Sequence, residues 1–232
     1  LGETAFFLIN KKLWKNSHSD ILLSLKPGLF LGVSLLFQIH GLHYTTATNS
    51  GFITSLYVIL IPFISILLFK TRIKFAHFIF AALAFTGMTF LLNIHSSSLS
   101  LNQGDLLTLG SAITAAFQII YIGITAPKAK NTFRYNNYQT FWCMLVVIPF
   151  FIFENFQKQI SIWPKSTSAM SILGLGLLIL FVSIIAFYLQ VQAQKKLSTT
   201  TASMLCLLEA PFSFLFASLL IGETLVGLQI AG

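Results

Sequence analysis

The distribution of positive charge along the chain is the feature that most restricts its fold. Twelve of the fourteen Lys and Arg residues fall in every second gap between long apolar stretches. These residues are Lys11, Lys12, Lys15 and Lys26, then Lys70, Arg72 and Lys74, then Lys128, Lys130 and Arg134, and finally Lys195 and Lys196. The intervening gaps hold only Lys158 and Lys165. By the positive-inside rule the basic gaps are cytoplasmic and the others face outward, so the pattern predicts a chain threaded back and forth through a membrane.

The apolar stretches have the length of membrane-spanning helices. About 20 residues cross a hydrocarbon core of about 30 Å, and the predicted spans are 27–44, 50–69, 75–94, 104–126, 137–154, 169–192 and 199–221. The chain is 56% hydrophobic and only 9% charged, whereas soluble domains are about 25% charged. The predicted fold class is therefore an all-α polytopic membrane protein. Short apolar runs at the two ends predict a chain truncated within a helix at each end.

The charge distribution and the motifs of the sequence disfavour nucleic-acid-binding proteins and enzymes. The formal net charge of +8 is spread over short loops, so it reflects topology, and we expect no nucleic-acid partner. The sequence has no metal-binding His and Cys spacing, no nucleophile motif and no phosphate-binding loop. We therefore expect no enzyme activity, no catalytic residues, no metal and no cofactor.

Two prolines indicate an internal repeat. Pro62 and Pro211 each precede a Phe within a span that begins with a Thr-rich segment. They lie five helices apart, so their helices cross in opposite directions. Proline-interrupted helices at matching places in inverted halves are typical of transporters with a midplane site. Proline is also tolerated in ordinary membrane helices, so the pair, rather than either residue alone, predicts two hinges.

At these motifs the chain resembles the EamA-type transporters of the drug/metabolite transporter superfamily. The resemblance rests on Tyr44 to Ser50, Thr54 to Pro62, Phe85 to Leu92 with Gly87, Gln192 to Ala202, Leu208 to Phe212, and Gly222 to Leu225. It implies ten helices in two inverted five-helix repeats, with both termini cytoplasmic. Residues 1–98 would be the first repeat, from the end of helix 2 to helix 5, and 99–232 the second, from helix 6 to the start of helix 10. The Gly222-Glu223 pair has no counterpart at Lys70 to Lys74.

Polar residues inside the spans predict where a solute could bind. In the span 104–126 they recur at steps of three and four, which places them on one helix face: Ser111, Thr114, Gln118, Tyr121 and Thr125. Shorter stripes occur in three other spans. We predict that substrate contacts come from Gln38, Tyr57, Gln118, Tyr121 and Gln190. The alternative is hydrogen bonding between helices, at about 0.6 kcal/mol per contact.

Glu209 is the most conspicuous single residue. It lies near the middle of the span 199–221, where a charged carboxylate costs about 2.5 to 3.5 kcal/mol on insertion scales. Such a residue is expected to face the interior, either neutral or paired. It could contact a substrate amine or carry a proton for coupling; the structural alternative is a protonated Glu hydrogen-bonded across the bundle.

Taken with the resemblance, these features predict a secondary transporter that works by alternating access. The family implies a small metabolite, such as an amino acid or related compound, moved outward across the bacterial cytoplasmic (inner) membrane. The expected partners are this solute, the lipid bilayer, a coupling proton and a second copy of the chain in a homodimer. A passive channel and an intramembrane enzyme are the alternatives from other classes.

Overall fold

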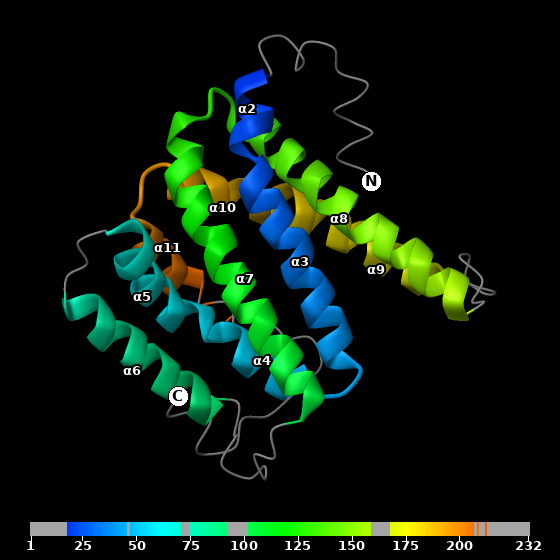
Figure 1. Ribbon diagram of the computed structural model, residues 1–232, viewed down its shortest axis with the longest axis horizontal. Helices are drawn as coiled ribbons and strands as arrows, with labels where there is room; N and C mark the ends of the chain where they lie inside the picture. Colours follow the sequence, from blue (N-terminus) through cyan, green and yellow to red (C-terminus); the bar gives the residue numbers. More distant parts are fainter. Residues whose placement is uncertain are drawn as a thin grey trace. The chain divides into compact units, whose positions relative to one another are not determined.

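Helices make up all the secondary structure in the part of the chain that is described. A computed structural model describes residues 18–45, 47–70, 75–91, 102–158, 168–206, 208 and 212. The α-helices there are α2 (His18–Leu23), α3 (Leu25–Leu42), α4 (Ala47–Ser55), α5 (Tyr57–Phe69), α6 (Phe75–Leu91), α7 (Gln103–Thr125), α8 (Thr132–Lys158), α9 (Ala169–Leu177), α10 (Phe187–Gln194) and α11 (Thr199–Cys206), shown in Figure 1. A short 3₁₀ helix, η3 (Ala126–Lys128), follows α7, and a π-helix, η4 (Leu178–Ala186), joins α9 to α10.

Four helical stretches in the described residues are long and apolar enough to cross a membrane. They are Leu25–Leu42, Gln103–Lys128, Thr132–Glu154 and Ile172–Gln194. These stretches coincide with four predicted spans, and the predicted all-α membrane fold is confirmed. The predicted spans 75–94 and 199–221 extend outside the described residues.

Helix α8 begins earlier than predicted. The apolar run indicated a span from residue 137, but the helix starts at Thr132. Asn131 caps it, because its Oδ1 accepts a hydrogen bond from the backbone N–H of Arg134 at 3.0 Å. The first turns are polar yet buried, which is why hydropathy alone places the start too late.

A reciprocal capping box fixes the start of α7. Asn102 Oδ1 accepts from the backbone N–H of Asp105 at 2.9 Å, and Asp105 Oδ2 accepts from the backbone N–H of Asn102 at 3.1 Å. Two backbone donors that the helix itself cannot use are satisfied in this way.

The C-terminus of α5 is closed by Lys70, which adopts the left-handed conformation with φ 51°. Its backbone N–H donates to the carbonyl of Ile66 at 3.1 Å.

The chain divides into two compact units. Unit 1 comprises Leu1–Val33 and Tyr121–Leu197, and unit 2 comprises Ser34–Ile120 and Ser198–Gly232. The division falls within α3 and within α7. This division groups residues that contact one another, whereas a repeat groups helices by their order and direction in the chain, so the two need not coincide. The repeats at 1–98 and 99–232 stay a prediction.

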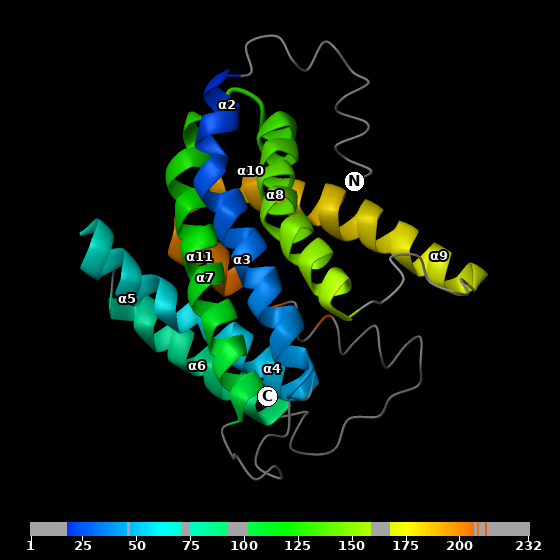
Figure 2. The same ribbon diagram turned by 45° about the vertical axis from the view of Figure 1, so that its right-hand side comes forward.

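In unit 1 the first half of α3 packs closely on α8 (Figure 2). The Gly28-x-x-x-Gly32 spacing predicts such an approach, and the structure confirms it. A Cβ added at Gly28 would lie 2.5 Å from Trp142 Cβ and 2.6 Å from the carbonyl oxygen of Gln139. A Cβ at Gly32 would lie 2.7 Å from Val146 Cβ. Only glycine lets the two backbones come this near.

A buried cluster joins the other elements of unit 1. It contains Ile122 of α7, Ala126 and Ala129 around η3, Tyr135 of α8 and Val191 of α10. The cluster therefore holds the connection between α7 and α8 against the last helix of the unit. This places the polar start of α8 beside the end of α10.

In unit 2 the second half of α3 packs on α7. A Cβ added at Gly104 would lie 2.6 Å from the carbonyl oxygen of Gly41, so the helix ends nearly touch. Thr45 Oγ1 donates to Asp105 Oδ1 at 2.5 Å beside this contact. Helix α5 lies against α6 and α11 in the same unit. The C-terminal end of α3 is thus tied to the start of α7 by both packing and a hydrogen bond.

Proline does not end the helix that contains Pro62. Helix α5 runs through it, and the break in the predicted span 50–69 is a turn at Leu56, between α4 and α5. The turn is held by the N–H of Ile59 donating to the Leu56 carbonyl at 3.0 Å. The predicted hinge at Pro62 stays a prediction, and Pro211 lies outside the described residues.

Candidate functional site

The predicted substrate residues that the structure describes fall in both units. Gln38, Tyr57 and Gln118 belong to unit 2, and Tyr121 and Gln190 belong to unit 1. Glu209 lies outside the described residues. The structure therefore does not test whether all six residues form one site.

Two of these residues occupy the interior of unit 2. Tyr57 is half-buried and packs against the cluster of Ile61, Ala116, Ile119 and Ile120. Gln118 is 4% exposed, and its Nε2 has no hydrogen-bond partner. An unpaired buried amide costs about 1–3 kcal/mol, so Gln118 is polar at a position where packing alone would favour an apolar residue.

Tyr121 of α7 faces α3 within unit 1. Its ring stacks on that of Phe30 at a centroid distance of 5.5 Å, with an angle of 13° between the planes. Lys26 Nζ lies 5.0 Å from the centroid of the same tyrosine, within the range of a cation–π interaction. The tyrosine ring thus already holds a cation on its face.

The polar stripe of α7 makes several contacts between helices. Ser34 Oγ donates to the carbonyl of Ser111 at 3.1 Å and lies 3.0 Å from its hydroxyl. Thr125 Oγ1 lies 2.6 Å from the hydroxyl of Tyr135. For these members of the stripe, hydrogen bonding between helices, the alternative weighed from the sequence, accounts for the polar side chains.

The first two turns of α8 form a buried polar segment that the sequence did not single out. The buried polar side chains there are Thr132, Arg134, Asn136, Asn137 and Gln139. Gln139 is fully buried, and neither atom of its amide has a partner. Asn136 Nδ2 donates to the backbone carbonyl of Ser183 in η4 at 3.2 Å. The hydropathy pattern assigned most of this segment to a loop.

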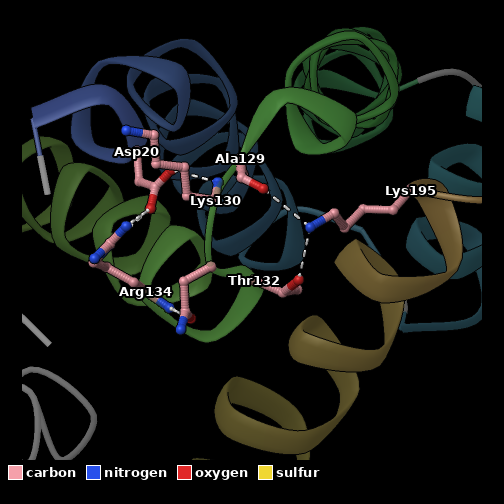
Figure 3. A network of polar contacts seen from close by, with 7 residues as sticks. Asp20, Ala129, Lys130, Thr132, Arg134 and Lys195 are labelled. Carbon is pink, nitrogen blue, oxygen red and sulfur yellow. Dashed lines mark hydrogen bonds and ion pairs between the residues drawn. The ribbon is translucent and has the colours of Figure 1, made fainter. Parts of the chain in front are cut away.

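An ion pair anchors this segment to α2. Arg134 Nε donates to Asp20 Oδ2 at 2.6 Å, and a second guanidinium nitrogen pairs with the same oxygen. Asp20 Oδ1 accepts from the backbone N–H of Lys130 at 2.9 Å. Figure 3 shows these contacts converging on the carboxylate from the loop and from α8. The signal in the sequence is that Asp20 is the one acidic residue in a basic gap.

Lys195, which follows the last residue of α10, reaches the same loop from the other side. Lys195 Nζ donates to the carbonyl of Ala129 at 3.1 Å and to Thr132 Oγ1 at 3.2 Å (Figure 3). Thr132 Oγ1 in turn donates to Gln192 Oε1 at 3.2 Å. The basic residues of the third and fourth basic gaps are therefore not only markers of topology.

Apolar helices of membrane length define an integral membrane protein, and a number of polar side chains are buried within it. The sequence matches the EamA-like transporter family over residues 4–93 and 102–232, and the chain belongs to that family. Membership confirms the resemblance noted in the sequence, and it indicates a membrane transporter rather than an enzyme.

Individual proteins are also similar to this chain. A protein of Archaeoglobus fulgidus described as an uncharacterized transporter is 31% identical over 227 residues, which is 98% of this chain and 68% of that protein. A crystal structure aligns with a TM-score of 0.65 and 14% identity, covering 99% of this chain and 88% of the other. At that identity the second likeness supports the fold alone.

Proposed function

We propose that the protein is a secondary carrier that exports a small metabolite, such as an amino acid or a related compound, by alternating access. Membership of the EamA-like transporter family over nearly the whole chain carries this proposal. The family match falls in two consecutive segments, 4–93 and 102–232. Two such segments support, in addition, a chain built from two inverted repeats that rock about a central site.

The proposed binding site is the set predicted from the sequence, with Glu209 at its centre. Glu209, Gln38, Tyr57, Gln118, Tyr121 and Gln190 would contact the solute, and Pro62 and Pro211 would serve as hinges. The buried Nε2 of Gln118, which has no hydrogen-bond partner, supports this role, because a solute would supply the missing acceptor. A site that combined the Glu209 carboxylate with these amide and tyrosine side chains would favour a zwitterionic or cationic solute over a polyanion.

The proposed location is the cytoplasmic (inner) membrane of a bacterium, with the basic loops inside. The charge pattern along the chain supports this orientation. A proton that couples transport and a homodimeric assembly belong to the same proposal. Measuring flux as a function of pH tests the coupling proton, and measuring the mass of the protein in detergent tests the homodimer.

Glu209 provides the direct test of the carrier proposal. Glu209→Gln keeps the shape of the side chain and its capacity for hydrogen bonds but removes its titration. The variant should insert and fold but lose flux, or lose the pH dependence of flux, in proteoliposomes loaded with candidate amino acids. Glu223→Gln, at the end of the same span, is the matched control and should transport normally. Wild-type flux with unchanged pH dependence in Glu209→Gln would reduce Glu209 to packing.

The same vesicles separate a carrier from a passive channel. A carrier saturates with solute and shows counterflow, in which unlabelled solute on one side drives labelled solute across from the other. Flux that rises linearly with concentration and shows no counterflow would favour the channel. Chemical conversion of the solute would favour the intramembrane enzyme.

A further inference from the structure

The last turn of α10 presents a polar cluster to the connection between α7 and α8. Gln194 and the C-cap residue Lys195 lie three and four residues after Val191, so both share a face of the helix with it. Val191 belongs to the buried cluster that includes Ala126 and Ala129. That face of α10 consequently lies against η3 and the start of α8, all within unit 1.

Lys195 has only neutral partners at this place. Its ammonium is half-buried and donates to the carbonyl of Ala129 and to the hydroxyl of Thr132. The nearby carboxylate, Asp20, is already paired with Arg134, and no carboxylate in the described ranges pairs with Lys195. An ammonium carries three donors, so one N–H of Lys195 is left over together with an uncompensated positive charge.

Gln194, the preceding residue in the chain, adds unused donors on the same helix face. Its side chain is 1% exposed, and neither Nε2 nor Oε1 has a hydrogen-bond partner. A buried polar group without a partner costs about 1–3 kcal/mol, so an apolar residue would be more stable here. The two residues leave three N–H groups unfilled against one unfilled oxygen, Gln194 Oε1, so donors outnumber acceptors in this cluster and it carries a positive charge.

This combination matches the chemistry of an anion bearing oxygen atoms. We propose that Lys195 and Gln194 form a binding site for an oxyanion, a carboxylate or phosphate group, at the cytoplasmic end of unit 1. The ammonium supplies the charge and the amide of Gln194 supplies further donors, as in charge-assisted hydrogen bonds. The site does not depend on the transport proposal and includes none of its predicted substrate residues.

The neighbouring lysine serves as an internal comparison. Lys196 is exposed, as are Lys128 and Lys130, and exposed lysines on this side need no explanation beyond the positive-inside rule. Lys195 differs because it is half-buried and turned toward protein acceptors. An effect seen at Lys195 and absent at Lys196 therefore reports the cluster and not the general charge of the loops.

The test measures how fast each lysine reacts with a water-soluble amine-acylating reagent. The protein is reconstituted in phosphatidylcholine vesicles, and modification of Lys195 and Lys196 is followed by mass spectrometry at constant ionic strength. Acetate or inorganic phosphate in place of chloride should slow acylation of Lys195 severalfold and leave Lys196 unchanged. Equal acylation rates of Lys195 in chloride, acetate and phosphate, or equal slowing at both lysines, would exclude a soluble oxyanion. The proposal is overturned if anionic lipid then also fails to protect Lys195 selectively.

A change of lipid and one variant complete the design. Vesicles that contain phosphatidylglycerol, with chloride as the only dissolved anion, test whether the oxyanion comes from a lipid headgroup. Selective protection of Lys195 in these vesicles assigns the oxyanion to lipid. Protection only by dissolved acetate or phosphate assigns the oxyanion to a soluble ion. Gln194→Leu should abolish the protection while the protein unfolds at an unchanged or higher temperature. Full protection in Gln194→Leu would remove Gln194 from the site and refute the two-residue proposal.

Discussion

Replacing Asp20 by Asn should destabilise the protein by about 3–5 kcal/mol, the cost of leaving a buried charge without its partner. The side chain of Arg134 is only 7% exposed and that of Asp20 is fully buried. Asn at position 20 has nearly the same shape, and its Oδ1 can still accept from the N–H of Lys130. What the substitution removes is the negative charge that compensates the guanidinium.

A double-mutant cycle separates this charge effect from a loss of packing. Arg134→Gln alone should also be destabilising, because it leaves the Asp20 carboxylate buried with the Lys130 N–H as its remaining described donor. In Asp20→Asn/Arg134→Gln both residues are neutral, so no charge is buried. The double variant should recover part of the loss, with a coupling free energy of about 2–3 kcal/mol.

Reversible unfolding in detergent, followed by circular dichroism, measures the free energy of each variant. Lys128→Gln is the control, because Lys128 is an exposed base on the same connection and surface changes usually stay within about 0.5 kcal/mol. Losses that simply add, or a loss below about 1 kcal/mol in Asp20→Asn, would refute the role given to the ion pair.

Two further predictions concern packing and orientation. Gly28→Ala should cost about 1–3 kcal/mol of unfolding free energy, since its Cβ would meet Trp142 at 2.5 Å. Gly51→Ala is the control, because no atom lies within 4 Å of its Cβ, and it should be neutral or stabilising by up to about 1 kcal/mol. Equal losses in unfolding experiments would contradict the close approach at Gly28. In a variant without native cysteines, a cysteine at Ser97 should react with an impermeant thiol reagent from outside and one at Asn131 from the cytoplasm. Reaction of the Ser97 variant only from the cytoplasm would reverse the topology.

The apolar runs and the charge pattern were enough to predict where most helices lie. The runs follow from the cost of placing polar groups in lipid, and the basic residues mark every second gap between the runs. They did not predict the start of α8. Its first turns are polar, and they are buried by elements that are distant in sequence, including α2 and α10. Hydropathy measures composition and does not record such burial.

The candidate site was predictable only in part. The spacing of the α7 stripe was right as a helix face, but Ser111 and Thr125 proved to contact other helices. The contacts of Asp20 and Lys195 join positions more than sixty residues apart in the chain. No local pattern encodes such pairs, so these residues appeared in the sequence only as charges in loops.

The π-helix η4 has a consequence for how the chain can vary in length. In an ordinary α-helix the loss of one residue turns everything beyond it by about 100°, which would carry Val191 out of its buried cluster. A π-helix holds more residues per turn, because its hydrogen bonds span five residues rather than four. A single deletion between Leu178 and Ala186 could therefore be absorbed by tightening the wide turns into α-helical ones. Related chains should tolerate a single-residue deletion in this stretch while keeping the end of α10 in register.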